Sequence, residues 1–224
     1  MLYVGIDFSI SSPAYAIIDK KDFIKWGSLT RSDRTAESHK KNPIKPYHIL
    51  DESPDLYNLL FMEKAKMPKE YSDRERIKID YFLIIVNNLW DSILEEVGDN
   101  EFMVAMEGLS FASNGNALID ISMATALLRE RIVGKIGSDK FFVYSPTSIK
   151  KFAVKGNAKK DQLYRALYES GFVGETLNSF TKLLKENEHE WITPKKAVNK
   201  PIDDLVDASW IALYLLSEVE NKSE

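Results

Sequence analysis

The sequence predicts an α/β fold in which a mixed sheet carries helices on both faces. Three short apolar stretches near the N-terminus are separated by brief turns, which is typical of antiparallel strands. Farther along, two strand-like stretches alternate with long segments of helical period, which is typical of parallel strands joined by helices. With 224 residues, of which 44% are hydrophobic and 29% charged, the chain is long enough to bury the core of one large domain.

The three N-terminal strands are expected at residues 3–7, 14–18 and 23–29, with a small-residue turn after the first. Residues 31–72 differ from the rest, because they are rich in charge and proline and show no sustained period. We interpret them as an insertion within a single domain spanning residues 1–224, with one short helix near residues 56–64.

The remaining elements are predicted from the spacing of apolar residues and from helix stop signals. Gly98, Gly137 and Gly171 each end a helical pattern. Two more strands complete a predicted five-stranded sheet, at residues 102–106 and 140–144. Helices are expected at residues 73–96, 117–136, 147–154, 159–170, 178–187 and 203–218.

Composition excludes several classes of site. The chain contains no cysteine, so it has no disulfide, no thiolate metal site and no cysteine nucleophile. It shows neither a signal-peptide pattern nor an apolar run long enough to span a bilayer, so we expect a cytoplasmic protein with no membrane association.

Charge is distributed unevenly. Residues 129–165 contain ten basic and three acidic side chains, a net charge of +7, in a chain whose net charge is −4. Such asymmetry suits one basic face for nucleic acid. On charge alone, however, a solvated lysine-rich surface is the more ordinary explanation.

Carboxylates stand at the ends of three separate apolar elements. Asp7 ends the first strand, Glu107 ends the fourth, and an acidic group opens the last helix. Strand ends that meet at one edge of a sheet would gather these side chains into one pocket, and carboxylate oxygens are the ligands that suit Mg²⁺ and Mn²⁺. The pattern therefore indicates a metal-dependent phosphoryl-transfer site, although each residue alone could be a turn or helix cap.

Four motifs in order resemble the RuvC-like Holliday junction resolvases, which have the ribonuclease H-like fold. They are GID followed by AYAII, then VAMEGLSF, then SPTSIKK with GNAKKDQ, and finally DDLVDASWIALYLL. The resemblance covers nearly the whole chain except residues 31–72, and it implies a divergent, phage-type member; in that case the compartment would be the host cytoplasm.

The resemblance implies that Asp7, Glu107, Asp204 and Asp207 are the catalytic and metal-binding residues. They would hold two Mg²⁺ ions, for which Mn²⁺ could substitute. Asp204 and Asp207 are three residues apart and so share a helix face. Asp203 is left over as a helix cap, and it leaves the choice between Asp203 and Asp204 open.

The same resemblance implies DNA-binding residues. Lys150 and Lys160 match the two family lysines near the scissile phosphate, and Lys159 is an alternative to Lys160 because the loop before it is one residue short. Phe111 stands near the position of an aromatic that stacks on bases at the junction centre. It could equally fold into the core.

The resemblance therefore implies a Mg²⁺-dependent endonuclease that resolves four-way DNA junctions by paired nicks. It also implies a homodimer formed through residues 117–136, with Met123, Ala126, Leu127 and Val133 at the interface. Other possibilities are a related nuclease for flaps, forks or packaging DNA, a non-catalytic DNA-binding module, and an actin-like kinase. The small size and few glycines argue against the kinase.

Overall fold

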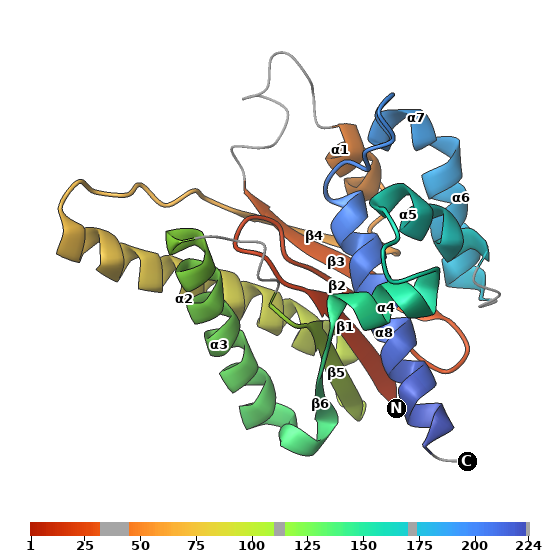
Figure 1. The fold of residues 1–224 in the computed structure, drawn as a ribbon, viewed down its shortest axis with the longest axis horizontal. Coiled ribbons are helices and arrows are strands. Elements are labelled where there is room, and N and C mark those ends of the chain that lie inside the picture. The colour runs from red at the N-terminus through yellow and green to blue at the C-terminus, as the bar shows by residue number, and fades with distance from the viewer. Residues whose placement is uncertain (32–44, 110–114, 170–173, 223–224) are drawn as a thin grey trace.

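The computed structural model describes residues 1–31, 45–109, 115–169 and 174–222, and these form one mixed sheet between two layers of helices (Figure 1). Six strands form the sheet in this part of the chain, in the order β4-β3-β2-β1-β5-β6. The strands are β1 (Leu2–Asp7), β2 (Ala14–Ile18), β3 (Phe23–Arg31), β4 (Tyr57–Met62), β5 (Phe102–Glu107) and β6 (Phe141–Tyr144). As predicted, β1, β2 and β3 are antiparallel, whereas β5 and β6 run parallel to β1.

The edge strand β4 corrects two predictions. The helix expected near residues 56–64 is wrong, because residues Tyr57–Met62 pair in parallel with β3. The sheet therefore has six strands instead of five. The interpretation of residues 31–72 as an insertion stays a prediction, but α1 (Lys45–Asp51) and β4 show that part of the segment belongs to the folded body.

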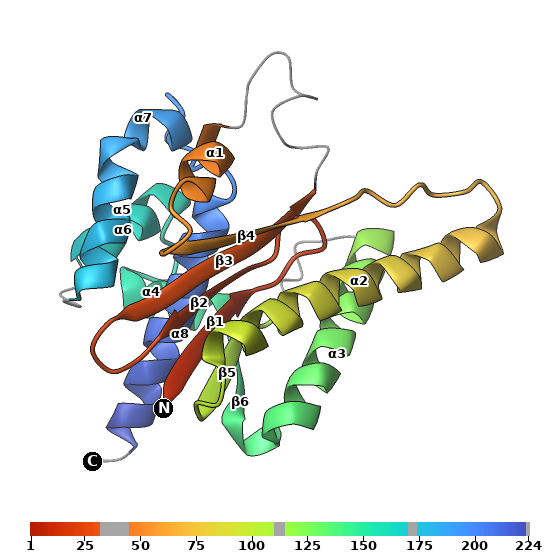
Figure 2. The ribbon, with the colours of Figure 1, turned by 180° about the vertical axis from the view of Figure 1, so that it is seen from behind.

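Each face of the sheet is covered by a different set of helices. One face carries α2 (Tyr71–Val97) and α3 (Asn116–Ile136), which Figure 2 shows in front of the strands. The other face carries α8 (Ile202–Asn221), with smaller helices beyond it. These are α4 (Pro146–Ala153), α5 (Lys160–Glu169), α6 (Glu175–Glu186) and α7 (Glu188–Trp191).

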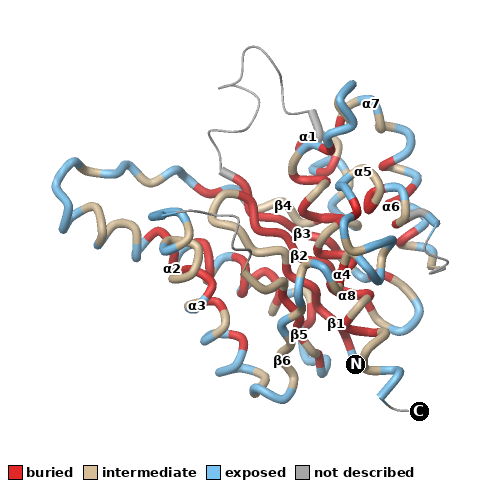
Figure 3. Tube along the Cα trace, viewed as in Figure 1, coloured by how far each residue is buried: buried red, intermediate tan, exposed pale blue. Residues whose placement is uncertain are grey.

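Alternation along β1 explains the two layers. Val4 and Ile6 are buried among residues of α2 and α3, whereas Tyr3 is buried in the cluster that includes α8. Successive strand residues point to opposite faces, so Gly5 and Asp7 share the α8 face with Tyr3. The central strands and α8 are buried along most of their length, while the N-terminal part of α2 projects into solvent (Figure 3).

Gly5 lets α8 approach the sheet unusually closely. A Cβ atom added at Gly5 would lie 2.2 Å from the backbone oxygen of Ala208 and 2.4 Å from the backbone nitrogen of Ala212. Only glycine therefore fits at this crossing, and the close contact fixes the height of α8 above β1. None of the helices that the structure describes is long and apolar enough to cross a membrane.

Candidate active site at the ends of β1 and β5

Asp7 occupies the last position of β1, at the centre of the sheet. It lies two residues beyond Gly5 on the same face, so its side chain points toward α8. The carboxylate is half-buried. The sequence thus places an acidic group at the one point where the sheet and α8 come closest.

Two further carboxylates lie on the first turns of α8. Asp204 is four residues before Ala208, so it shares the helix face that rests on β1 at Gly5. It is only 2% exposed, whereas Asp203 and Asp207 are half-buried. Asp207 and Asp204 are the two nearby charges that raise the pKa of Asp7 most. The burial of Asp204, on the face of α8 that rests on β1, favours Asp204 over Asp203 as the partner of Asp7.

Glu107 joins this group from the neighbouring strand. The parallel register between β1 and β5 pairs Ile6 with Met106, which brings the ends of the two strands side by side. Glu107 then faces a cavity of about 220 Å³ beside α8. The lining residues are Glu107, Pro146, Ile149, Lys150, Lys160, Leu163, Asp207, Trp210 and Ile211.

The crowding of carboxylates shifts their protonation. Burial, together with the charges of Asp207 and Asp204, raises the pKa of Asp7 well above its usual range. Burial and the charge of Asp207 raise the pKa of Glu107. Burial raises the pKa values of Asp203 and Asp207 as well, against the opposing effect of nearby lysines. The nearby lysines therefore do not fully offset the burial and mutual repulsion of these carboxylates.

Lys160 extends from α5 and pairs with Asp207, and its ammonium lies 3.9 Å from Oδ2 of Asp203. Burial lowers the pKa of Lys160, but the charges of Asp207 and Asp7 outweigh it and raise the pKa overall. Lys150 lines the same cavity from α4. Lys159 instead lines an adjacent cavity, so the geometry brings Lys160 and not Lys159 to the carboxylates.

Lys200 is a member of the cluster that sequence reasoning missed. Its ammonium pairs with Oδ1 of Asp204 and lies 3.8 Å from Oδ2 of Asp203. Burial alone would lower the pKa of Lys200, but the charges of Asp204 and Asp203 outweigh burial and raise the pKa overall. The only signal in the sequence was the four-residue spacing between Lys200 and Asp204, which is also common in ordinary surface pairs.

The cluster suits a hard divalent cation by its donor chemistry. Among the described residues, no three acidic, imidazole or thiolate side chains form a ready-made metal site, and ammonium groups already contact Asp204 and Asp207. Yet Oδ1 of Asp203 and Oδ2 of Asp204 are buried without a hydrogen-bond partner. Negative charge also remains in excess, since five carboxylates face three lysines: Asp7, Glu107, Asp203, Asp204 and Asp207 against Lys150, Lys160 and Lys200. Unsatisfied carboxylate oxygens are the donors that Mg²⁺ and Mn²⁺ prefer.

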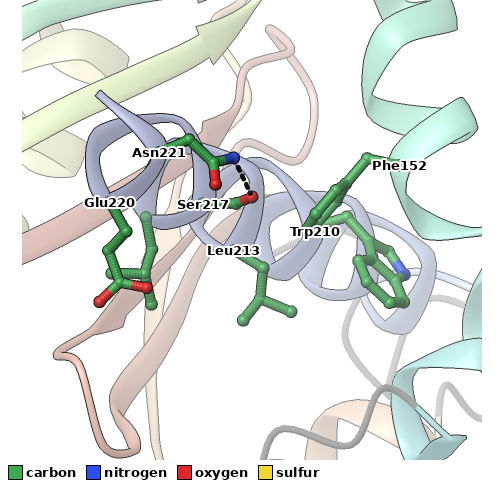
Figure 4. A pocket seen from close by; sticks show the side chains of 7 residues that line it. Phe152, Trp210, Leu213, Ser217, Glu220 and Asn221 are labelled. Carbon is green, nitrogen blue, oxygen red and sulfur yellow. Dashed lines mark hydrogen bonds between the residues drawn. The ribbon is translucent and has the colours of Figure 1, made fainter. Parts of the chain in front are cut away.

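Two other features complete the description of the site. Phe111 falls outside the described residues, so its predicted role stays a prediction. A smaller cavity of about 200 Å³ lies beside α8, where Figure 4 shows Phe152, Trp210 and Leu213 near Ser217, which accepts a hydrogen bond from Asn221. Its lining mixes apolar side chains with Ser217, Glu220 and Asn221, and a single carboxylate is no cluster of charges of the kind that phosphoryl transfer needs.

Comparison with known proteins tests the fold. No family model matches the sequence, and no curated protein matches it. Among solved structures, RuvC from Thermus thermophilus aligns over 98% of this chain and 97% of its own, with a TM-score of 0.50 and 14% identity. The chain has a RuvC-like fold. A second structure, T. thermophilus RuvC in complex with Holliday junction substrate, aligns over 98% of this chain and 96% of its own, with a TM-score of 0.47 and 12% identity. The RuvC-like fold confirms the predicted arrangement of antiparallel and then parallel strands.

Proposed function

We propose that this protein is a metal-dependent endonuclease that cleaves branched DNA, with four-way junctions as its substrate. One observation carries the proposal: four carboxylates from β1, β5 and α8 converge beside a cavity that also holds lysines. Acidic groups that gather without enough counter-charge suit a bound divalent cation. Lysines beside them suit a phosphate. The RuvC-like fold and the four sequence motifs support the same reading.

In this proposal, Asp7, Glu107, Asp204 and Asp207 hold two Mg²⁺ ions, or Mn²⁺ in their place. Bound divalent cations would activate a water and stabilise the leaving 3′-oxygen of the phosphodiester. The carboxylates supply ligands and fix the position of the cations, and they take no covalent role. Cleavage would then leave 5′-phosphate and 3′-hydroxyl ends.

The lysines position the DNA. Lys150 and Lys160 both line the cavity beside Glu107 and Asp207, where an ammonium can contact a phosphate oxygen as a point charge. Lys159, which lines the adjacent cavity, is assigned to a DNA contact farther from the carboxylates, and Phe111, outside the described residues, keeps its predicted role in stacking on a base. Lys200 pairs with Asp203 and Asp204. We therefore assign its charge to Asp204 and not to the phosphate.

We also propose a homodimer, because two nicks on opposed strands of a junction need two sites at a fixed spacing. The structure changes which residues of α3 can form it. Met123 and Leu127 are partly buried and pack against the core of this chain, so they have less surface to offer a partner. Ile119, Ala126 and Val133 are exposed instead, and their seven-residue spacing places them on one outward stripe.

The decisive experiment incubates the purified protein with a labelled mobile four-way junction, with and without Mg²⁺, beside fork, flap and linear duplex substrates. We expect Mg²⁺-dependent paired nicks in the junction, and none with the Asp7→Asn variant. Preferential cleavage of forks or flaps would instead identify the protein as a related nuclease with one of these as its substrate. Cleavage that persists in Asp7→Asn would contradict the assigned site.

A further inference from the structure

A second cavity next to the carboxylate site is strongly basic. Its volume is about 620 Å³, and two segments far apart in the sequence form its walls. One segment is the start of α5 with the residues before it, and the other is the turn that leads from α7 toward α8. The lining residues are Lys155, Asn157, Lys159, Lys160, Asp161, Gln162, Lys195, Lys196 and Ala197.

Of the five lysines that line this cavity, only Lys160 has a carboxylate partner among the described residues. Within the described parts of the chain, Lys155, Lys159, Lys195 and Lys196 form no ion pair with a carboxylate. Asp161 is the single acidic residue in the lining, and it lies in the first turn of α5, where the helix dipole already favours it. Like charges that are held together without a partner repel each other, so the cavity favours binding of an anion.

The turn that presents Lys195 and Lys196 is built and anchored. The backbone amides of Lys196 and Ala197 donate to the carbonyl oxygen and hydroxyl oxygen of Thr193, and Ile192 pairs with Val198. The preceding Trp191 is fully buried, and its indole nitrogen donates to the hydroxyl of Tyr164 in α5 at 2.9 Å. The turn is thereby tied to the helix that forms the opposite wall.

Lys196 also adopts a backbone conformation that lysine rarely takes. Its φ is 61°, in the left-handed region where glycine is favoured. Such a residue costs of the order of about 1 kcal/mol or more, and glycine would avoid the cost. The turn thus holds the Lys196 side chain beside three other lysines that have no carboxylate partner among the described residues.

The basic cavity continues into the carboxylate site, because Lys160 lines both. We propose that it is a second phosphate-binding site, which holds the phosphates of the DNA strand that flank the phosphate bound at the carboxylates. This inference rests on the proposed endonuclease function. It assigns Lys195 and Lys196 to DNA binding, in a turn that none of the recognised motifs includes.

The test measures DNA affinity as a function of salt. The protein carries Asp7→Asn to prevent cleavage, and the probes are a labelled four-way junction and a single-stranded oligonucleotide. Each lysine that neutralises a phosphate of a single strand contributes about −0.7 to the slope of log affinity against log salt, so Lys195→Gln with Lys196→Gln should flatten that slope by about 1.4. At moderate salt the affinity should fall by about tenfold or more.

Three further variants make the result specific. Lys20→Gln removes one lysine charge from the turn between β2 and β3, at the opposite end of β1 from Asp7, and should change neither quantity. Lys195→Arg with Lys196→Arg should keep the slope. Lys196→Gly should weaken binding while it leaves thermal stability equal or higher, which separates lost charge from lost folding.

The outcomes are distinguishable. If the starting protein binds DNA and the glutamine pair leaves slope and affinity unchanged, the second site is wrong while the proposed function stands. If the protein with Asp7 intact neither binds nor cleaves any branched DNA, the proposed function fails, and this inference fails with it. Equal losses in Lys20→Gln would show a general charge effect and would also overturn the site.

Discussion

Replacing Gly5 by alanine tests whether the crossing of β1 and α8 positions the site. The added Cβ would lie 2.2 Å from the Ala208 oxygen, 2.4 Å from the Ala212 nitrogen and 3.0 Å from the Ala212 Cα. All three are backbone atoms, so no side chain can rotate away. Since relaxed carbon contacts begin near 3.5 Å, strand and helix must separate by about 1 Å.

This separation has two measurable costs. Overpacking of a core ordinarily costs about 1–3 kcal/mol, and a backbone clash on both sides places Gly5→Ala at or above about 3 kcal/mol. For a chain of this length each kcal/mol lowers the melting temperature by about 2–4 °C, so we expect a loss of about 6–12 °C. A shift of about 1 Å between Asp7 and Asp204 should also lower junction cleavage by about a hundredfold at temperatures where the variant is folded.

Gly134→Ala is the matched control. Gly134 lies in α3, and a Cβ added there meets no atom within 4 Å. Alanine should stabilise the helix by about 0.5–1 kcal/mol. Thermal unfolding followed by circular dichroism compares the two variants. A Gly5→Ala protein that melts with the wild type and cleaves normally would refute the close crossing and the positioning argument together.

Three other predictions address the charges and the assembly. Because the pKa of Asp7 is raised in the folded state, its contribution to stability is present at low pH and is lost as pH rises through the folded pKa. Asp7→Asn should therefore raise the melting temperature of the metal-free protein at about pH 8 but not at low pH, and it should reduce the stabilisation given by Mg²⁺. Lys200→Gln leaves Asp204 buried without its ammonium partner, so the melting temperature of the metal-free protein should fall, while the rise in melting temperature on adding Mg²⁺ should grow. An unchanged rise would contradict the pairing. Ala126→Glu places a charge in the centre of the exposed α3 stripe and should convert a dimer to a monomer in sedimentation, with paired nicking lost before single nicking; a wild-type monomer that still makes coordinated double nicks would rule the dimer out.

The sequence was sufficient for most strands because their patterns are simple. The run around Val4 and Ile6 is apolar, ends in a carboxylate, and is followed by a small-residue turn. Such a buried central strand leaves little choice of assignment. The stretch at β4, YNLLFM, is ambiguous, since a short apolar run suits a helix or a strand equally. Only its pairing with β3, which lies more than 20 residues earlier, decides the outcome.

For the site as well, local spacing could be interpreted from the sequence, whereas roles that depend on tertiary contacts could not. The spacing of Asp204 and Asp207 was enough to place both carboxylates on one helix face. It could not identify Lys200, because its role depends on where the chain enters α8. Nor could it show that Met123 and Leu127 serve the chain's own core, since the pattern of α3 alone does not reveal which of its faces meets α2.

The position of α8 in the chain has a consequence for biosynthesis. β1 is made before the other described strands, yet α8, which covers one of its faces, follows all of them. At about 5–20 residues per second, ribosomes would need roughly 10–40 s to travel from one to the other. Throughout that interval the face bearing Tyr3 stays open, and Asp7 and Glu107 stand without Asp204 and Asp207. A partly synthesised chain therefore presents an apolar surface for chaperones, and the four carboxylates come together only after α8 has emerged from the ribosome.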